Sequence, residues 1–342
     1  MSRRPTIVDV ATEAGVSKAT VSRYFNHRER LLSPDIAARV ETAIAKLGYS
    51  PSPMAQALSH GRSRLIGLVV ADITNPYSVA VLRGAEKVCQ EAGYLVMLFN
   101  LGNDRSRERV AIDALASYQV DGFILNTQGQ EDGHMDMAAL RGIPAVLVDR
   151  RHPGLDADFV SLDNPQAIRS ACDHLVDQGW RDLLYLTQPM VGVSSRLERM
   201  EAFRQCVQRH GAAVHGKVQE LHTDDNAALV PLLQQWRAAA GTKRPPAIVT
   251  GNSVVTLRVA AAIDQLGWSF GEDLGFVGVD DPEWAPLIRP GLSAVAQPTD
   301  AIGQCAAQCL MERLGGLQSP ARERLLPGQL VVRGSSLRRP AR

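Results

Sequence analysis

The stretch 17–26 combines basic and short polar side chains in a way that suits contact with nucleic acid. Lys18 and Ala19 stand at the amino end of a predicted helix, where a helix inserted in the major groove meets base edges. Arg23 shares the polar face of that helix, which can read bases. The short donors suited to phosphate oxygens are Ser17, Thr20, Ser22 and Asn26. The chemistry predicted for this stretch is recognition of DNA.

Two short helices joined by a tight turn must position these side chains. Thr6 can cap a first helix that begins near Ile7, and we also include Thr6 among the candidate DNA contacts. Gly15 supplies the backbone freedom that the turn needs, and Ser17 can cap a second helix that runs to about Phe25. The alternative is a solvated amphipathic hairpin. The turn glycine, the cap and the polar face together favour a helix-turn-helix that reads a DNA groove.

A third helix is predicted after Ser33 and Pro34, and its apolar stripe completes a small three-helix core. The connector that follows, 49–53, holds two prolines and cannot be helical. The next segment, 54–59, is too short to be helical alone in water, so it needs a partner or DNA to order it. Within it Ala55 is a candidate DNA contact. Leu58 is either a wedge between base steps of the minor groove or an exposed residue of a linker.

The charge of the chain is unevenly distributed. Residues 1–64 hold ten Lys/Arg and five Asp/Glu, which gives them a formal charge of +5. Since the whole chain carries +1, the remaining 278 residues carry −4. A basic amino-terminal segment on an acidic body is the footprint expected of phosphate binding.

Arg196 and Arg199 lie one helical turn apart, just after an apolar run. Two guanidinium groups at this spacing suit an anion, because each can grip a carboxylate or phosphate through two parallel hydrogen bonds. The alternative is a solvated helix face in which Glu198 and Glu201 partner the arginines.

From residue 65 onward, short apolar runs alternate with longer amphipathic ones, which predicts an α/β fold with parallel sheets. The predicted strands are 65–72, 94–100, 122–127, 145–149, 159–163, 182–187, 247–252 and 274–281. They end on polar residues, namely Asp72, Asn100, Asn126, Asp149, Asp163, Thr187, Asn252 and Asp280. Ligands bind beyond the carboxyl ends of parallel strands, so this set predicts a polar small-molecule site. For any one residue, capping of the next helix is an equal alternative.

The rest of the sequence excludes other classes. No apolar run is long enough to cross a membrane, no signal peptide is apparent, and the five cysteines form no CxxC pair, so we expect a cytoplasmic protein. Cys305 and Cys309 are interpreted as packing residues rather than metal ligands. We expect no cofactor or metal, and no catalysis, since the usual nucleotide-binding, hydrolase and zinc-protease motifs are absent. A sugar-binding protein without a regulatory role is a further alternative, but it leaves the first 60 residues unexplained.

The segments VDVATEAGVSKATVSRYFN, AKLGYSP and AQAL resemble the DNA-binding head and hinge helix of the lactose/galactose repressor family. The resemblance implies that Lys18 and Ala19 are the main base-reading residues, that Arg23 makes a further base contact, and that Leu58 intercalates. Many members have Asn-Arg where this chain has Ser52 and Pro53, which puts the hinge contacts to phosphate at that point in doubt.

The remainder resembles the effector domain of the same family, which is similar to periplasmic sugar-binding proteins. The resemblance implies effector contacts from Tyr77, Ser78, Asp149, Arg199, Asn252, Asp280 and Gln297. Asn126 is added as a strand end and Arg196 for its charge. Where the family usually has Asn-Asp, this chain has Asn252 and Ser253, so one hydrogen bond near the sugar is expected to differ.

The resemblance also implies two Rossmann-like lobes joined by three crossings, expected near Leu162, Gly291 and Pro327. The expected domains are a helix-turn-helix head at 1–50, a hinge at 51–64, a first lobe at 65–162 with 292–326, and a second lobe at 163–291 with 327–342.

Within the family, DITNPYSVAVLRGAEKVCQEAGYLVMLFN and GNDRSRERVAIDAL look most like regulators of ketogluconate and related sugar-acid use. We therefore expect a homodimeric repressor that binds a palindromic operator and releases it when 2-ketogluconate binds. Another hexonate, a neutral sugar or a purine is the alternative effector. Corepression instead of induction stays open, since the sequence does not give the sign of the coupling.

Overall fold

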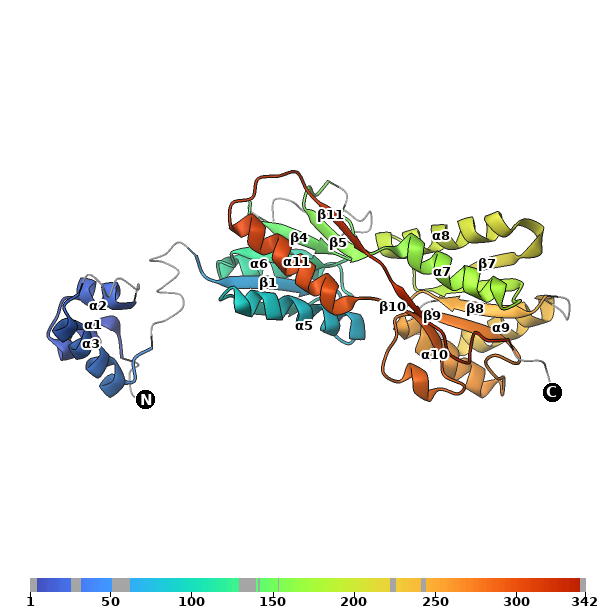
Figure 1. The fold of residues 1–342 in the computed structure, drawn as a ribbon, viewed down its shortest axis with the longest axis horizontal. Helices are drawn as coiled ribbons and strands as arrows, with labels where there is room; N and C mark the ends of the chain where they lie inside the picture. The colour runs from blue at the N-terminus through green and yellow to red at the C-terminus, as the bar shows by residue number, and fades with distance from the viewer. Residues whose placement is uncertain are drawn as a thin grey trace. The chain divides into compact units, whose positions relative to one another are not determined.

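The structure, a computed structural model, describes residues 5–25, 32–50, 62–128, 140, 142–152, 154–221, 226–240 and 244–338. The chain divides into two compact units, Met1–Ser63 and Arg64–Arg342, called here the head and the body (Figure 1). Among the described residues, no helix is long and apolar enough to cross a membrane.

The described residues of the head form three helices, and the predicted caps are confirmed at their ends. They are α1 (Ile7–Ala14), α2 (Lys18–Phe25) and α3 (Pro34–Leu47). Thr6 and Asp9 form a capping box at the start of α1, and Gly15 ends this helix with a left-handed φ of 64°. Arg39 of α3 donates from Nη2 to the carbonyl oxygen of Ala14 at 2.6 Å, so α3 satisfies the carboxyl end of α1. The core consists of Val10, Ala11, Ala14, Val21, Val40 and Ala43.

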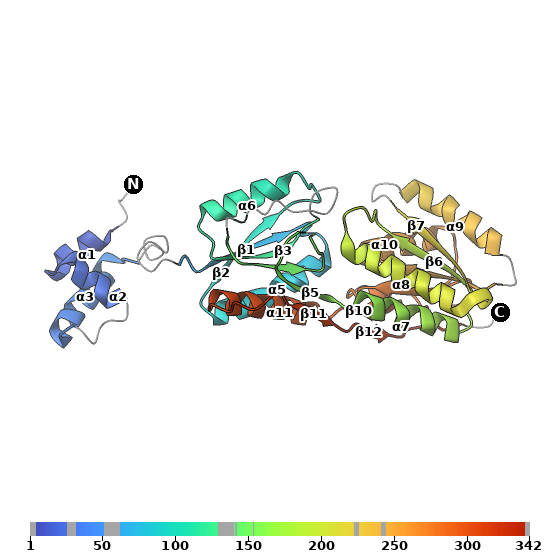
Figure 2. The same ribbon diagram turned by 90° about the horizontal axis from the view of Figure 1, so that it is seen from above.

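The first lobe of the body is built on a six-stranded sheet of order β11-β5-β4-β3-β1-β2, in which every pair is parallel. Its strands are β1 (Leu65–Val70), β2 (Leu95–Asn100), β3 (Gly122–Asn126), β4 (Ala145–Val148), β5 (Asp158–Leu162) and β11 (Glu323–Leu326). Helices α5 (Pro76–Glu91) and α11 (Thr299–Leu314) cover one face, and α6 (Arg107–Ser117) covers the other (Figure 2).

The second lobe repeats this arrangement with a sheet of order β12-β10-β9-β8-β6-β7, in which only β12 is antiparallel to its neighbour. Its strands are β6 (Asp182–Thr187), β7 (His215–Glu220), β8 (Pro246–Thr250), β9 (Gly275–Val279), β10 (Ser293–Ala296) and β12 (Gln329–Val331). One face is covered by α7 (Asn164–Asp177) and α8 (Ser194–His210), and the other by α9 (Asn226–Ala240) and α10 (Ser253–Gln265). Short 3-10 turns lie at Gly211–Ala213 and Ala285–Leu287. The predicted fold class is confirmed.

The chain passes between the lobes after Leu162, after Ala296 and after Leu326 (Figure 1). The second crossing was expected near Gly291, and it lies a few residues later in the chain. Ser293–Ala296 still pairs with β9 of the second sheet, for example Val295 with Val279, so the chain leaves the second lobe only after β10. Helix α11 then packs on α5 in the first lobe.

Candidate DNA-binding and effector sites

The amino end of α2 presents its side chains to solvent. Ser17, Lys18, Ala19 and Arg23 are exposed, whereas Val21 on the opposite face is fully buried in the head core. The Ser17 hydroxyl accepts a hydrogen bond from the backbone N–H of Thr20 and also contacts the Thr20 hydroxyl. Local capping therefore fixes the start of the helix while its basic side chains stay available to a partner.

The other candidate DNA contacts differ in accessibility. The Thr6 hydroxyl donates to the Asp9 carboxylate at 2.7 Å, so its proton is committed to the capping box rather than to a phosphate. Thr20 and Ser22 are partly buried. Asn26, Ala55 and Leu58 lie outside the described residues.

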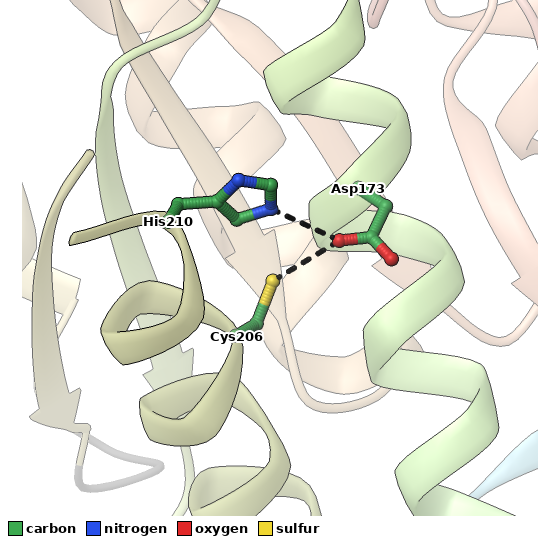
Figure 3. A group of neighbouring side chains, drawn as sticks. All are labelled: Asp173, Cys206 and His210. Carbon is green, nitrogen blue, oxygen red and sulfur yellow. Dashed lines mark hydrogen bonds and ion pairs between the residues drawn. The ribbon is translucent and has the colours of Figure 1, made fainter. Parts of the chain in front are cut away.

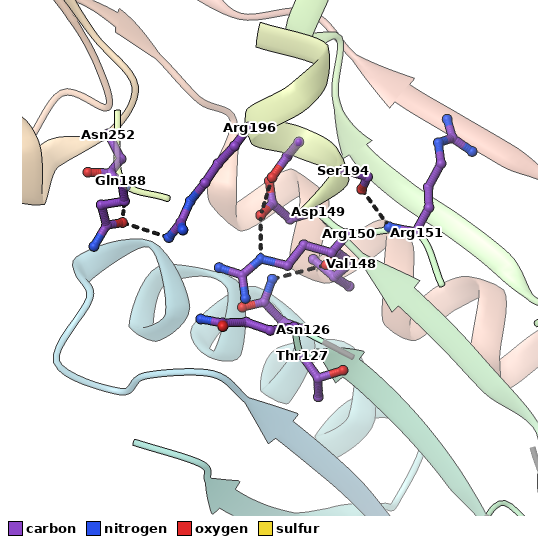
Figure 4. A network of polar contacts seen from close by, with 12 residues as sticks. Asn126, Thr127, Val148, Asp149, Arg150, Arg151, Gln188, Ser194, Arg196 and Asn252 are labelled. Carbon is purple, nitrogen blue, oxygen red and sulfur yellow. Dashed lines mark hydrogen bonds and ion pairs between the residues drawn. The ribbon is translucent and has the colours of Figure 1, made fainter. Parts of the chain in front are cut away.

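Polar side chains from both lobes of the body converge at the carboxyl ends of the strands (Figure 4). Asp149 follows β4 in the first lobe and accepts a hydrogen bond from the Ser195 hydroxyl of α8 in the second lobe at 3.1 Å. It also lies 3.5 Å from Nη2 of Arg199 and 3.5 Å from Nε of Arg150. Asn126 at the end of β3 donates to the Val148 carbonyl at 3.0 Å. We call this region the inter-lobe site.

Arg199 is held by the protein itself. It is 5% exposed, its Nε donates to Asn164 Oδ1 at 2.6 Å, and its Nη1 donates to the Gly251 carbonyl at 2.7 Å. Burial alone would lower the pKa of Arg199, but the nearby Asp149 carboxylate raises it above its ordinary value. Arg199 is therefore a fixed positive charge at this site, and its burial excludes the alternative that it lies on a solvated helix face.

Arg196 also uses its donors on protein atoms. Its Nη1 donates to the Pro189 carbonyl at 2.6 Å and its Nη2 to Gln188 Oε1 at 2.7 Å. The same Gln188 oxygen accepts from Asn252 Nδ2 at 2.7 Å (Figure 4). Burial and the positive charge of Arg150 lower the pKa of Arg196 to about 9, so a negative charge at this point would be favourable.

Arg150 was not predicted from the sequence, although, unlike Arg196 and Arg199, it leaves two of its donor nitrogens without a hydrogen bond to the described residues. It is 8% exposed, and its Nε and Nη1 have no hydrogen-bond partner among the described residues. Burial lowers its pKa despite the adjacent Asp149. The sequence did hold one indication of a buried arginine, the run Asp149-Arg150-Arg151 directly after a buried strand. From the sequence alone, both arginines of this run could equally be solvated.

The first turn of α5 brings Tyr77 and Ser78 to this region, both buried. The Tyr77 hydroxyl has no hydrogen-bond partner among the described residues. Burial first, and then the negative charge of Asp149, raise the pKa of Tyr77 well above its ordinary value, so the hydroxyl stays a donor.

On the second lobe, Asp280 follows β9 and accepts from Gln297 Nε2 at 2.6 Å and from the Ser253 backbone N–H at 2.9 Å. Asn252 caps α10 through the Val255 N–H while its amide nitrogen reaches Gln188. At three other predicted strand ends, the polar side chain forms hydrogen bonds with a turn or a helix start. Asp72 and Asn100 accept from backbone N–H groups of turns, and Asp163 caps α7.

Buried polar atoms without a hydrogen-bond partner are concentrated at this site within the described part of the body. They include Tyr77 Oη, Asp149 Oδ1, Arg150 Nε and Nη1, Ser253 Oγ and Gln297 Oε1. Buried polar groups are normally satisfied, so such a concentration indicates the position of a polar ligand. The arginines outnumber the carboxylates, which favours a ligand with negative charge.

A basic helix-turn-helix head joined to a two-lobed body with a polar site between its lobes defines a ligand-responsive DNA-binding regulator. Residues 6–52 match the model described as bacterial regulatory proteins, lacI family, and residues 172–336 match the periplasmic binding protein-like domain. The chain is 45% identical over 333 residues to the HTH-type transcriptional regulator PtxS of Pseudomonas plecoglossicida, covering 97% of this chain and 96% of that one. This chain belongs to the lacI family.

A further relative agrees with this membership, and solved structures show the same fold. The HTH-type transcriptional regulator KdgR of Bacillus subtilis is 34% identical over 330 residues, covering 96% of this chain and 97% of that one. The Lac repressor dimer bound to operator and the anti-inducer ONPF has the same fold, with a TM-score of 0.82 at 24% identity over 98% of this chain and 100% of that one. The transcriptional regulator CelR in complex with cellobiose gives a TM-score of 0.69 at 25% identity, covering 97% of this chain and all of that one.

Proposed function

We propose that the protein is a cytoplasmic transcriptional repressor whose effector is a sugar acid, with 2-ketogluconate as the first candidate. It acts by binding alone, without catalysis. As a homodimer it presents two heads to a palindromic operator, and effector binding between the lobes releases the DNA. The similarity to PtxS over nearly the whole chain supports a related regulatory role.

The observation that carries the effector class is that two nitrogens of buried Arg150, Nε and Nη1, make no hydrogen bond to the described residues. A guanidinium buried without its hydrogen bonds is unfavourable, and a carboxylate is the group that best satisfies it. Arg196 and Arg199 add positive charge nearby but already donate to protein atoms. The carboxylate of the sugar acid would therefore bind Arg150. The hydroxyl groups of the sugar acid would form hydrogen bonds with Tyr77, Asp149 and Gln297.

Direct contacts across the lobes give a route from effector to DNA. Arg105 of the first lobe donates to the Val191 carbonyl of the second, and the Arg151 backbone N–H donates to the Ser194 hydroxyl of α8 at 2.8 Å. An effector that changes these contacts changes the angle between the lobes and so the spacing of the two hinges. A coupling of about 1 to 3 kcal/mol would change operator affinity roughly 5- to 150-fold.

Calorimetric titration with 2-ketogluconate, alongside gluconate, glucose and guanine, tests the effector class. We expect saturable binding of the keto acid and much weaker binding of the neutral compounds. Arg150→Gln should lower the affinity for the keto acid at least tenfold, the scale of one charge-assisted hydrogen bond. Arg204→Gln is the matched control, because Arg204 is exposed on α8, the helix that carries the other two arginines.

Two results would overturn this assignment. If glucose or guanine gives a heat of binding and no sugar acid does, the effector is not an anion, although the protein is still a ligand-responsive regulator. Equal affinities of the Arg150 and Arg204 variants would remove Arg150 from the site. The effect of the bound compound on operator affinity, measured by fluorescence anisotropy, then gives the sign of the coupling.

A further inference from the structure

A second group of ligand-type side chains lies on α7 and α8, outside the inter-lobe site. Cys206 and His210 are four residues apart on α8 and therefore share one face of that helix. Asp173 faces them from α7 (Figure 3). One donor atom from each of the three residues lies within 4.8 Å of the other two.

Two of the three distances between the donor atoms match the edges of a metal tetrahedron. His210 Nε2 lies 3.1 Å from Asp173 Oδ1, and Cys206 Sγ lies 3.5 Å from the same oxygen. Zinc bonds of about 2.0 Å to nitrogen and oxygen and about 2.3 Å to sulfur give tetrahedral edges of about 3.3 and 3.5 Å. The three donors could therefore bind one ion with little movement of either helix.

The donor set also selects the kind of ion. Thiolate and imidazole ligands favour zinc and similar thiophilic cations, whereas magnesium and calcium prefer oxygen ligands alone. Cys206 is buried, while Asp173 and His210 are partly exposed and leave a path from solvent. Water would complete the tetrahedron from that side. Binding would release the Cys206 thiol proton to solvent, since the metal ligand is the thiolate.

The side chain of Arg209 already contacts two of the three proposed metal ligands. Arg209 Nη2 is 2.5 Å from Asp173 Oδ1 and 3.5 Å from Cys206 Sγ. The Arg209 side chain is 50% exposed, so its guanidinium can turn into solvent when a metal ion arrives. It is therefore a competitor for the site rather than a permanent obstacle.

We propose that Asp173, Cys206 and His210 bind one thiophilic divalent cation of the zinc class, which joins α7 to α8 and competes with Arg209. At their amino ends the same two helices are joined by Asn164, which bonds both Arg199 and Glu198. The ion would hold the helix pair at a second point and so stabilise the second lobe.

The test uses full-length, tag-free protein stripped with a chelator, desalted, and titrated with Co²⁺ as an optical probe for the site. We expect one equivalent of Co²⁺ per chain, a thiolate-to-metal charge-transfer absorption, and loss of this absorption when Zn²⁺ is added. Cys206→Ser and His210→Ala should each abolish it. Arg209→Gln should tighten Co²⁺ binding several-fold, because the competing guanidinium is gone.

Cys305→Ser is the matched control, since Cys305 is a partly exposed free cysteine on α11 of the first lobe, away from the proposed site. It should bind Co²⁺ as the unmodified protein does. The proposal is wrong if the unmodified protein shows no thiolate absorption, if Cys206→Ser retains it, or if Cys305→Ser loses it. If Cys206→Ser fails to fold, His210→Ala is the deciding variant, because His210 is only partly buried. Zn²⁺ should raise the Tm of the unmodified protein but not that of His210→Ala, and equal shifts would reject the site.

Discussion

Asp149 and Asp280 occupy equivalent positions in the two lobes. Each follows the fourth strand of its sheet counted from the β2 or β7 edge, and each has a left-handed backbone, with φ of 66° and 75°. The backbone N–H of each donates to the neighbouring strand, at Val160 and Val295 respectively, in both cases at 3.0 Å. Asp tolerates this conformation better than most side chains. The duplicated fold thus aims one carboxylate from each lobe at the same site.

Replacing Asp149 with Asn keeps a side chain that tolerates the left-handed backbone but removes the negative charge. Arg150 and Arg199 are then buried without their carboxylate partner. Loss of one member of a buried ion pair predicts destabilisation of roughly 3 kcal/mol, measured by urea unfolding at neutral pH. Asp156→Asn, at an exposed position, is the control and should be nearly neutral. A change below about 1 kcal/mol in Asp149→Asn would show that the arginines do not depend on this carboxylate.

Tyr77→Phe should separate stability from effector binding. Its buried hydroxyl has no partner among the described residues, so removing it should leave the free energy of unfolding unchanged or raise it by up to about 1 kcal/mol. The same change should weaken effector binding roughly tenfold, because one hydrogen bond to the ligand is lost. Calorimetry and urea unfolding measure the two effects. Tyr118→Phe, at a half-exposed residue, should alter neither. Unchanged effector affinity in Tyr77→Phe would take Tyr77 out of the site.

The sequence was sufficient for the head and for the strands β1 to β6, β8 and β9, because these segments carry strong local signals. The caps at Thr6 and Ser33 and the turn at Gly15 lie where they were predicted. The strands β7, β10, β11 and β12 were not predicted. They are short or edge strands, and β7, with the sequence HGKVQE, has no apolar run. Their pairing is set by parts of the chain far away in sequence, which local patterns cannot reveal.

The site was only partly predictable for a related reason. Strand ends can be found from the sequence, but capping and ligand binding use the same residue types, so Asp163 and Asp280 could not be told apart. Arg150 differs from Arg151 only in its surroundings. Arg151 is 41% exposed in its side chain and pairs with Glu198 and Glu323, whereas Arg150 is only 8% exposed. Burial of this kind is a property of the folded body.

Gly303→Ala tests the close contact of α5 and α11. A Cβ atom at residue 303 would lie 2.1 Å from the Val81 carbonyl oxygen, so the helices would have to separate. Overpacking of this kind predicts a loss of roughly 2 kcal/mol or more in the free energy of unfolding. Gly315→Ala at the end of α11 is the control, because its nearest neighbours would be 3.3 Å away. Urea midpoints should fall for the first variant only, and equal midpoints would contradict the close packing.

The buried ion pairs of Asp158 predict that the stability of the protein depends on pH in a specific way. Burial alone would raise its pKa, but hydrogen bonds from Arg313 and Arg322 outweigh this and hold the pKa well below the usual range. A lowered folded-state pKa means that the stabilisation is complete above the unfolded-state pKa of about 3.9 and is lost as the pH falls further toward the folded-state value. Asp158→Asn should therefore unfold about 3 kcal/mol more easily at pH 7.

The same variant should respond less to acid than the unmodified protein, because the titrating group that links stability to pH is gone. Urea unfolding at pH 7 and again below pH 4 measures both effects. Asp113→Asn, an aspartate on the surface of α6, is a suitable control, since its side chain is 39% exposed. Identical acid responses in Asp158→Asn and the unmodified protein would show that Asp158 does not contribute to the acid sensitivity of the fold.

Lys18→Ala tests whether the exposed end of α2 reads bases. A base contact predicts that the variant loses roughly 1 to 3 kcal/mol on the preferred operator and discriminates less against operators changed at one position. A phosphate contact predicts instead an equal loss on every duplex and a smaller salt dependence. Lys46→Ala is the control, because Lys46 lies on α3, away from the α2 face, and pairs with Glu13 of α1. Anisotropy titrations against a set of single-position operator variants, at two salt concentrations, distinguish the outcomes. A uniform loss across that set would reassign Lys18 from base reading to backbone positioning, leaving Ala19 and Arg23 as the remaining candidates for specificity.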